Sequence, residues 1–122
     1  MSTYNKDFAG FLTTAGKIIA ETRENTSREP QGRNLLQILC RLYTEYFPGR
    51  KIYIAVKLGK RLSYLTGAGK ELYLEPEVIE IQDKYVVFIE TKSGLLRGEK
   101  EEIAALFSSV LAFLSRLGFI KT

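Results

Sequence analysis

The stretch Tyr46–Lys70, YFPGRKIYIAVKLGKRLSYLTGAGK, decides the fold, because the spacing of apolar residues changes within it. Before this stretch apolar residues recur every three to four positions, which is typical of helices, and inside it they alternate, which is typical of a half-buried strand. The stretch also holds six basic residues and no acidic residue: Arg50, Lys51, Lys57, Lys60, Arg61 and Lys70. It therefore predicts both the start of a sheet and a basic surface.

The alternation predicts a strand over 51–58. Ile52, Ile54, Val56 and Leu58 would face the core, and Lys51, Tyr53, Ala55 and Lys57 would face solvent. Gly59-Lys60 predicts a two-residue type II′ turn, because glycine readily takes the positive φ that this turn needs. The return strand then covers Arg61–Thr66 and sets Ala55 opposite Tyr64, Tyr53 opposite Thr66 and Lys57 opposite Leu62. Tyr64 would share the outer face with Tyr53, whereas a three-residue loop would bury it.

Two amphipathic helices are predicted before the strand. Residues 5–24 carry one apolar stripe, formed by Phe8, Phe11, Leu12, Ala15, Ile18 and Ile19. The segment 24–32 breaks the pattern and is predicted as a loop. Residues 33–47 form a second helix, which Pro48-Gly49 ends.

After the hairpin we expect further strands and one last helix. Gly67-Ala68-Gly69 is predicted as a turn, and Leu72-Tyr73-Leu74 starts a strand that Pro76 interrupts, at an edge or a bulge. Val78–Ile81 and Tyr85–Thr91 predict a second hairpin. Residues 99–117 predict a helix with acidic residues in its first turn. The sequence thus predicts a single α+β domain, residues 1–122, with two N-terminal helices, a four- or five-stranded antiparallel sheet packed on one face, and one C-terminal helix (ααββββα).

The predicted last helix is apolar around more than half of its circumference. A heptad-like seam is formed by Ile103, Leu106, Val110, Phe113 and Leu117, and a second stripe by Ala104, Phe107, Leu111 and Leu114. If one stripe covers the sheet, the other needs a partner, and we expect a homodimer built on the seam. The alternative, that one chain buries both stripes, stays open.

Composition limits the chemistry. The chain has no histidine and a single cysteine, so we expect no catalytic residue, no metal site and no cofactor, and we interpret Cys40 as a core residue. Thr66–Glu71 looks like a phosphate loop but has Tyr64 and Glu71 where that motif needs glycine and Ser or Thr. Glu75, Glu77, Glu80 and Glu90 alternate with apolar residues, which favours a solvated strand face over paired catalytic carboxylates. We therefore expect a non-enzymatic cytoplasmic protein without a membrane segment, and the scarcity of Asn, Gln and Met indicates a thermophile.

Charge is distributed unevenly along the chain. Residues 1–70 hold 12 basic and 5 acidic residues, and residues 71–122 hold 6 basic and 9 acidic residues. A basic patch attracts polyanions, because binding releases their counterions. Tyrosines between lysines on an open sheet face can stack on bases while the cations contact phosphates, and single strands leave their bases free to stack. The alternative is a solvated face whose tyrosines only pair across strands.

The layout and the segment GRKIYIAVKLGKRLSYL (49–65) resemble the archaeal ThermoDBP family of single-stranded-DNA-binding proteins. The resemblance covers most of the chain in layout and composition, and it implies binding of single strands in a cleft with an apolar floor and basic walls. The candidate binding residues are Arg50, Lys51, Tyr53, Lys57, Lys60, Arg61, Tyr64 and Lys70, with DNA favoured over RNA. A second hypothesis is an accessory protein that docks on a larger complex or filament, and a third is a small-molecule binder with a pocket between sheet and helices.

Overall fold

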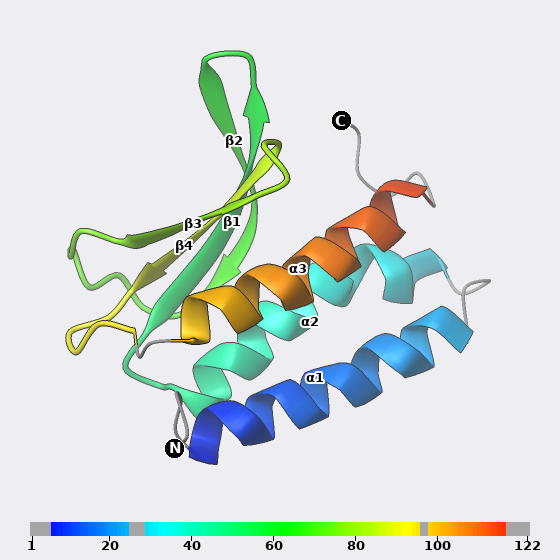
Figure 1. The fold of residues 1–122 in the computed structure, drawn as a ribbon, viewed down its shortest axis with the longest axis horizontal. Coiled ribbons are helices and arrows are strands. Elements are labelled where there is room, and N and C mark those ends of the chain that lie inside the picture. Colours follow the sequence, from blue (N-terminus) through cyan, green and yellow to red (C-terminus); the bar gives the residue numbers. More distant parts are fainter. Residues whose placement is uncertain (1–5, 25–28, 96–97, 117–122) are drawn as a thin grey trace.

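The computed structural model describes residues 6–24, 29–95 and 98–116. In chain order these residues form α1 (Lys6–Glu24), α2 (Glu29–Tyr46), β1 (Lys51–Leu58), β2 (Arg61–Ala68), β3 (Glu77–Ile81), β4 (Tyr85–Glu90) and α3 (Glu99–Arg116). Two helices, a four-stranded antiparallel sheet and a last helix make an α+β fold, which confirms the predicted class (Figure 1). No helix of the described residues is long and apolar enough to cross a membrane.

The sheet has the strand order β2-β1-β4-β3, so β1 and β4 are central and β2 and β3 lie at the edges. All three strand pairs are antiparallel. Every position of β4 is buried except Phe88, which is half-buried, as befits a central strand. Pro76 directly precedes the edge strand β3, where a missing backbone N–H costs no ladder hydrogen bond.

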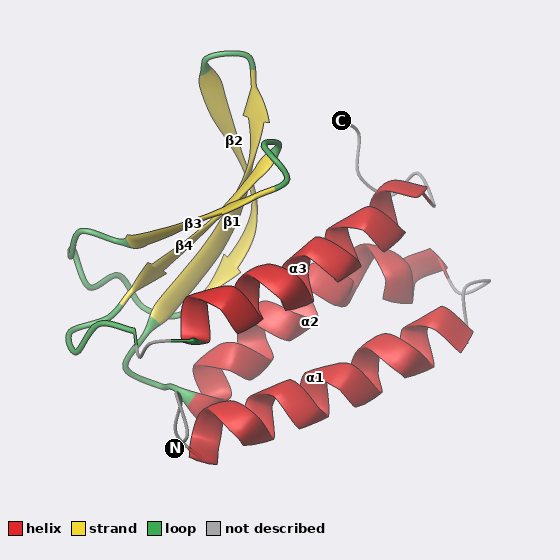
Figure 2. Ribbon diagram, viewed as in Figure 1, coloured by secondary structure: helices red, strands yellow, loops and turns green. Residues whose placement is uncertain are grey.

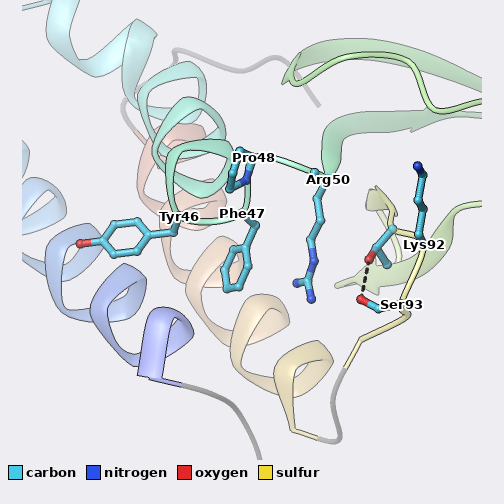
Figure 3. A pocket seen from close by; sticks show the side chains of 8 residues that line it. Tyr46, Phe47, Pro48, Arg50, Lys92 and Ser93 are labelled. Carbon is cyan, nitrogen blue, oxygen red and sulfur yellow. Dashed lines mark hydrogen bonds between the residues drawn. The ribbon is translucent and has the colours of Figure 1, made fainter.

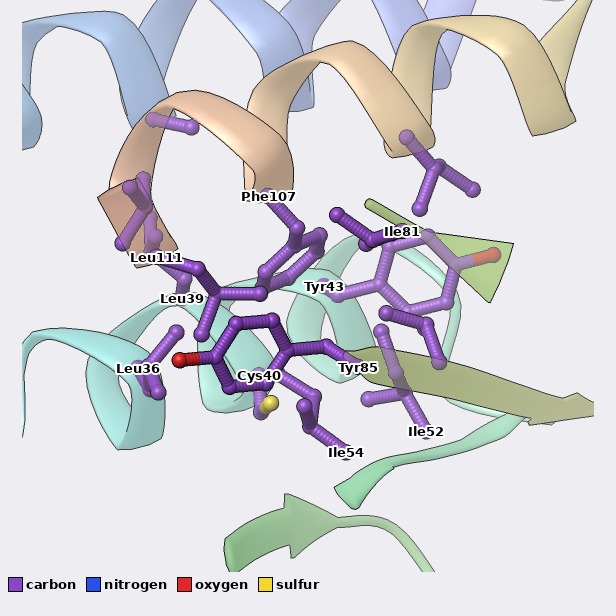
Figure 4. Close-up of a cluster of buried hydrophobic side chains, with 14 of the residues drawn as sticks. Leu36, Leu39, Cys40, Tyr43, Ile52, Ile54, Ile81, Tyr85, Phe107 and Leu111 are labelled. Atoms are coloured by element: carbon purple, nitrogen blue, oxygen red, sulfur yellow. The ribbon is translucent and has the colours of Figure 1, made fainter. Parts of the chain in front are cut away.

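All three helices lie on the same side of the sheet (Figure 2). α2 contacts β1 and β2, α3 contacts β3, and α1 packs against α2. The inward residues of β1, Ile52 and Ile54, meet Tyr43 and Phe107 in one continuous core (Figure 4). The Phe11 ring of α1 packs edge-on against the Tyr43 ring of α2, with centroids 5.2 Å apart, and this contact joins the two helices. The opposite face of the sheet has no helix over it among the described residues.

The first hairpin confirms the two-residue turn. Leu58 pairs with Arg61, and Gly59 has φ 64°, the positive value that the turn requires. Lys57 lies opposite Leu62 and Ala55 opposite Tyr64, as predicted. The predicted pairing of Tyr53 with Thr66 is wrong, because a bulge shifts the register between Ile54 and Ala55, and Tyr53 pairs with Gly67.

Gly67 suits the bulged register because Tyr53 lies very close to it. A Cβ on residue 67 would lie 2.7 Å from both the Ile52 carbonyl oxygen and the Tyr53 Cβ. The predicted turn at 67–69 is therefore displaced: Gly67 and Ala68 continue β2, and only Gly69, with φ 102°, leaves the strand.

Two further boundaries differ from the prediction. α2 begins at Glu29 rather than at residue 33, because Pro30 is tolerated in a first helical turn, where the backbone N–H has no partner in any case. The predicted strand at Leu72-Tyr73-Leu74 does not form, so the described sheet has four strands and not five. Residues 69–76 instead cross from the β2 edge to the β3 edge, and Tyr73 takes a φ of 55° that no strand allows.

The seam on α3 faces the core of its own chain. Ile103 and Val110 have no exposed surface, Phe113 is 8% exposed and Leu106 is half-buried, while Leu117 lies outside the described residues. The second stripe is covered as well, since Phe107, Leu111 and Leu114 are buried. Within the described residues, α3 therefore buries most of both stripes against its own chain, and the homodimer built on the seam stays a prediction.

Candidate nucleic-acid interface

The open face of the sheet is opposite the helices. Because side chains alternate along a strand, Lys51, Tyr53, Ala55 and Lys57 of β1 point to this face, and the register adds their neighbours. These neighbours are Leu62, Tyr64, Val78, Glu80, Val86, Phe88 and Glu90. We call this set the outer face. The predicted outward orientation of Tyr64 is confirmed, with 65% of the residue exposed.

The centre of the outer face is apolar. Ala55 and Val86 are only 4% and 3% exposed although no helix covers them, because larger neighbours surround these small residues. Beside them Tyr53 and Phe88 stack, with ring centroids 4.8 Å apart and an interplanar angle of 17°. Leu62 and Val78 are about half exposed on either side of this centre. The apolar surface that remains open to solvent is thus at Leu62 and Val78, and exposed apolar surface of this kind is typical of an interaction site.

Three of the six predicted phosphate-binding cations are engaged within the chain. Lys57 pairs with Glu80 at 2.9 Å, Lys51 pairs with Glu71, and Arg50 pairs with Glu99 at 3.5 Å. All three acidic partners come from residues 71–99, the acidic part of the sequence. The charge asymmetry along the chain is therefore partly cancelled in space.

Arg50 is the most deeply engaged of these cations. Its side chain is 10% exposed, its Nη1 donates to the Tyr43 hydroxyl at 2.8 Å, and its guanidinium lies over the Phe47 ring at 4.3 Å. Burial raises the pKa of Tyr43 to about 12, and the neighbouring Arg50 charge opposes that rise. Arg50 therefore does not lie on the outer face, because its side chain is held beside Tyr43 and Phe47 of α2.

Lys60, Arg61 and Lys70 are exposed and form no ion pair with any described residue. Lys60 and Arg61 lie at the tip of the β1–β2 hairpin, which extends away from the helices in Figure 1. Leu58, at the same tip, is 48% exposed although it belongs to the inward set, because the helices do not reach it. The hairpin is thus a projecting arm that carries two free cations.

The two predicted stacking residues have different surroundings. The Tyr53 ring stacks on Phe88, and the Lys51 ammonium lies 5.4 Å from its centroid. Burial, followed by the negative charge of Glu90, raises the pKa of Tyr53. Tyr64 makes no such ring contact with a described residue and is the more exposed of the two. Tyr53 therefore forms part of the floor, and Tyr64 presents a ring that a base can reach.

Sequence reasoning missed Tyr73 and Phe88. Tyr73 is 89% exposed and has a positive φ, and the Leu74 amide beside it donates to Glu90 Oε1 at 3.2 Å, which ties residues 69–76 to the outer face. The apolar alternation at 72–74 predicted a strand, so Tyr73 was not recognised as an exposed loop residue. A loop is required at this place because the chain has to join opposite edges of the sheet. Phe88 could have been found from the alternation in β4 once its pairing with β1 was known.

Three of the four acidic residues considered for catalysis have structural partners. Glu80 pairs with Lys57, Glu77 with Lys100 at 3.1 Å, and Glu90 is buried and accepts from the Leu74 amide. Glu75 is exposed. Among the described residues, no group of three or more His, Cys, Asp or Glu side chains is placed to hold a metal ion. Comparison of the sequence with protein-family models and with curated proteins gives no match.

Proposed function

We propose that this chain binds single-stranded nucleic acid, without strong base preference, on the outer face and the projecting β1–β2 hairpin. The observation that carries the proposal is the exposed ring of Tyr64 on the strand that begins with the free cation Arg61. Aromatic stacking is worth roughly 1–3 kcal/mol per base and suits any base, while unpaired cations contact the phosphates. DNA is the ligand that we propose first, and the cytoplasm is the proposed location.

The structure refines the roles within this proposal. Lys60, Arg61 and Lys70 are the proposed phosphate contacts, because each is exposed and none has a described partner to release. Tyr64 is the proposed stacking residue, and Tyr73, in the 69–76 segment that the Leu74 amide ties to Glu90, is a second one. Lys51 and Lys57 can contribute only by exchanging an intramolecular carboxylate for a phosphate, so we assign them a minor part.

Titration of a fluorescently labelled single-stranded oligonucleotide at low and at high salt tests the proposal. We expect saturable binding at low salt that weakens as salt rises, and weaker binding of a duplex with the same sequence, whose bases are not free to stack. Absence of binding at low salt, or affinity indifferent to salt, would contradict the proposal.

A second candidate function is docking on another protein, including a second copy of this chain. The observation in its favour is the exposed apolar set Leu58, Leu62 and Val78, each close to half exposed. A pull-down that recovers one protein partner and survives nuclease treatment would support this function. Sedimentation of the purified chain as a monomer at micromolar concentration would exclude its homodimeric form.

A further inference from the structure

A shallow cleft of about 360 Å³ lies where α2 ends and β1 begins (Figure 3). Its lining comes from two segments that are distant in sequence: Tyr46, Phe47, Pro48, Gly49 and Arg50 on one side, and Thr91, Lys92 and Ser93 on the other. The segments meet because Lys51 pairs with Glu90, which places the residues just before β1 beside those just after β4. The cleft is therefore at the end of the sheet, separate from the apolar centre of the outer face.

The Arg50 guanidinium is held in a fixed orientation at this cleft. Its Nη1 donates to both internal partners, the Tyr43 hydroxyl at 2.8 Å and Glu99 Oε2 at 3.5 Å, and its Cζ lies over the Phe47 ring. Its Nε and Nη2 donate to no residue in the described part of the chain. Nε and Nη2 form the edge through which a guanidinium can donate to two oxygens at once. Arg50 also lines the cleft.

The opposite wall adds hydroxyl groups and a charge. The Thr91 and Ser93 hydroxyls lie 3.4 Å apart, and Figure 3 shows the Arg50 side chain extending between Phe47 and Ser93. Lys92 is exposed and makes no ion pair with a described residue. Glu99 compensates the charge of Arg50, so the uncompensated positive charge of the lining is that of Lys92, whose side chain extends away from Arg50 and Ser93 at the rim of the cleft (Figure 3).

We propose that this cleft binds a phosphoryl group. Two of its oxygens would accept from Nε and Nη2 of Arg50, and a third would accept from Ser93 or Thr91, with Lys92 contributing charge. A carboxylate has only two oxygens and would leave the hydroxyls unused. The cleft is larger than a phosphate, and its wall of Tyr46, Phe47 and Pro48 leaves room for the organic group of a phosphate monoester. The ligand is thus a free nucleotide or phosphate, or the terminal phosphate of an oligonucleotide.

NMR titration with inorganic phosphate at constant ionic strength, with chloride as the balancing anion, tests the site. We expect saturable shifts in the millimolar range at the amides of Arg50, Thr91 and Ser93 and at the Arg50 Nε–H. The double variant Lys92→Gln/Ser93→Ala should weaken binding roughly tenfold, because it removes a charge and a hydrogen bond to an ionised group. Lys84→Gln, which removes another exposed lysine at the other end of β4, should leave binding unchanged.

These variants change only exposed side chains, so they keep the Arg50–Glu99 pair intact. Shifts that spread over surface lysines without saturating, or equal binding by the double variant and the wild type, would overturn the proposal. The test does not depend on the proposed function, because inorganic phosphate has no base to stack on Tyr64.

Oligonucleotides distinguish the source of the phosphoryl group. If the strand end is the ligand, a 5′- or 3′-phosphorylated single strand binds more tightly than the same strand with hydroxyl ends, and the Lys92→Gln/Ser93→Ala variant abolishes the difference. If a free nucleotide is the ligand, a nucleoside monophosphate shifts the same amides, the unphosphorylated nucleoside does not, and the two strands bind equally. Failure of the phosphate titration refutes the site by itself, and failure of both arms refutes both of these sources of the phosphoryl group.

Discussion

The basic residues of the stretch 50–70 fall into two groups, those that pair with a carboxylate and those that have no described partner. Arg50, Lys51 and Lys57 contact carboxylates of their own chain, whereas Lys60, Arg61 and Lys70 point into solvent without a described partner. Exposed ion pairs contribute only about 0–1 kcal/mol to stability, so the Lys57–Glu80 pair matters more for the surface charge than for the fold. The Arg50–Glu99 pair is different, because Glu99 is fully buried.

Replacing Glu99 by Gln should lower the free energy of unfolding by roughly 3 kcal/mol, since the change leaves the Arg50 charge buried without its carboxylate. Urea denaturation measures this loss. The matched control is Glu75→Gln, an exposed carboxylate whose removal should change stability by less than about 0.5 kcal/mol. Equal stability of the two variants would show that the buried pair does not stabilise the fold.

Replacing Tyr64 by Ala should weaken binding of single-stranded DNA roughly tenfold, because it removes one stacking surface. Tyr64→Phe retains the ring and should bind like the wild type. Since Tyr64 is 65% exposed, both variants should melt close to the wild-type temperature. Unchanged affinity of Tyr64→Ala in an anisotropy titration would remove this residue from the site.

Among the elements, the strands show most clearly what local patterns can and cannot predict. β1 was predicted with its bounds because alternation from Ile52 to Leu58 and the glycine at 59 are local signals. The bulge that pairs Tyr53 with Gly67 was not predictable, because it depends on contact between two strands. The loop at Tyr73 was missed for a related reason: apolar alternation there resembles a strand, but the strand order requires a crossing.

The turn of the second hairpin holds two non-glycine residues with positive φ, Gln82 at 54° and Asp83 at 60°. The Lys84 amide donates to the Ile81 carbonyl at 3.2 Å across this turn. Asp83→Gly should therefore raise the free energy of unfolding by roughly 0.5 kcal/mol, because relief of backbone strain exceeds the added entropy of the unfolded chain.

The matched comparison is in the first hairpin, where a glycine with positive φ is replaced instead of introduced. Gly59→Ala has space for its methyl group, but φ 64° disfavours alanine, so it should destabilise by about 1 kcal/mol. Thermal unfolding of both variants checks the pair. A stabilising Gly59→Ala or a destabilising Asp83→Gly would contradict the assigned backbone strain.

For the molecule as a whole, the layering was predictable and the surface charge was not. The apolar stripes indicate which sides of α1, α2 and α3 are buried, and the core of Phe11, Tyr43 and Ile54 follows from them. The outer face depends on which acidic residues fold against which basic ones. Glu71, Glu80 and Glu99 are 20 or more positions away in sequence from their cations, and no local pattern links them.

The core should make the protein sensitive to alkali. Burial raises the pKa of Cys40 from 9.0 to about 12 and that of Tyr43 from 10.0 to about 12. The unfolded chain therefore loses these protons first, so stability present below pH 9 falls as the pH rises toward 12, by at most about 1.4 kcal/mol per pH unit for each group.

Urea denaturation at several pH values in this window measures the fall. Cys40→Ala should show a shallower decline, because only the contribution of Tyr43 remains from this pair of groups. The smaller side chain of Cys40→Ala also lowers the stability, but this loss does not depend on pH. Comparison of the slopes of stability against pH therefore isolates the contribution of the thiol. Identical slopes for the variant and the wild type would contradict the assignment.

The salt dependence of single-stranded DNA binding tests most directly whether three free cations form the interface. Each contact with a single strand contributes about −0.7 to the slope of log K against log salt, so Lys60, Arg61 and Lys70 predict a slope of about −2. Lys60→Gln/Arg61→Gln should reduce this slope to about −0.7, whereas the neutral double change Lys57→Gln/Glu80→Gln should leave it near −2. A wild-type slope near −4, as six contacts would give, or no dependence on salt would contradict the account.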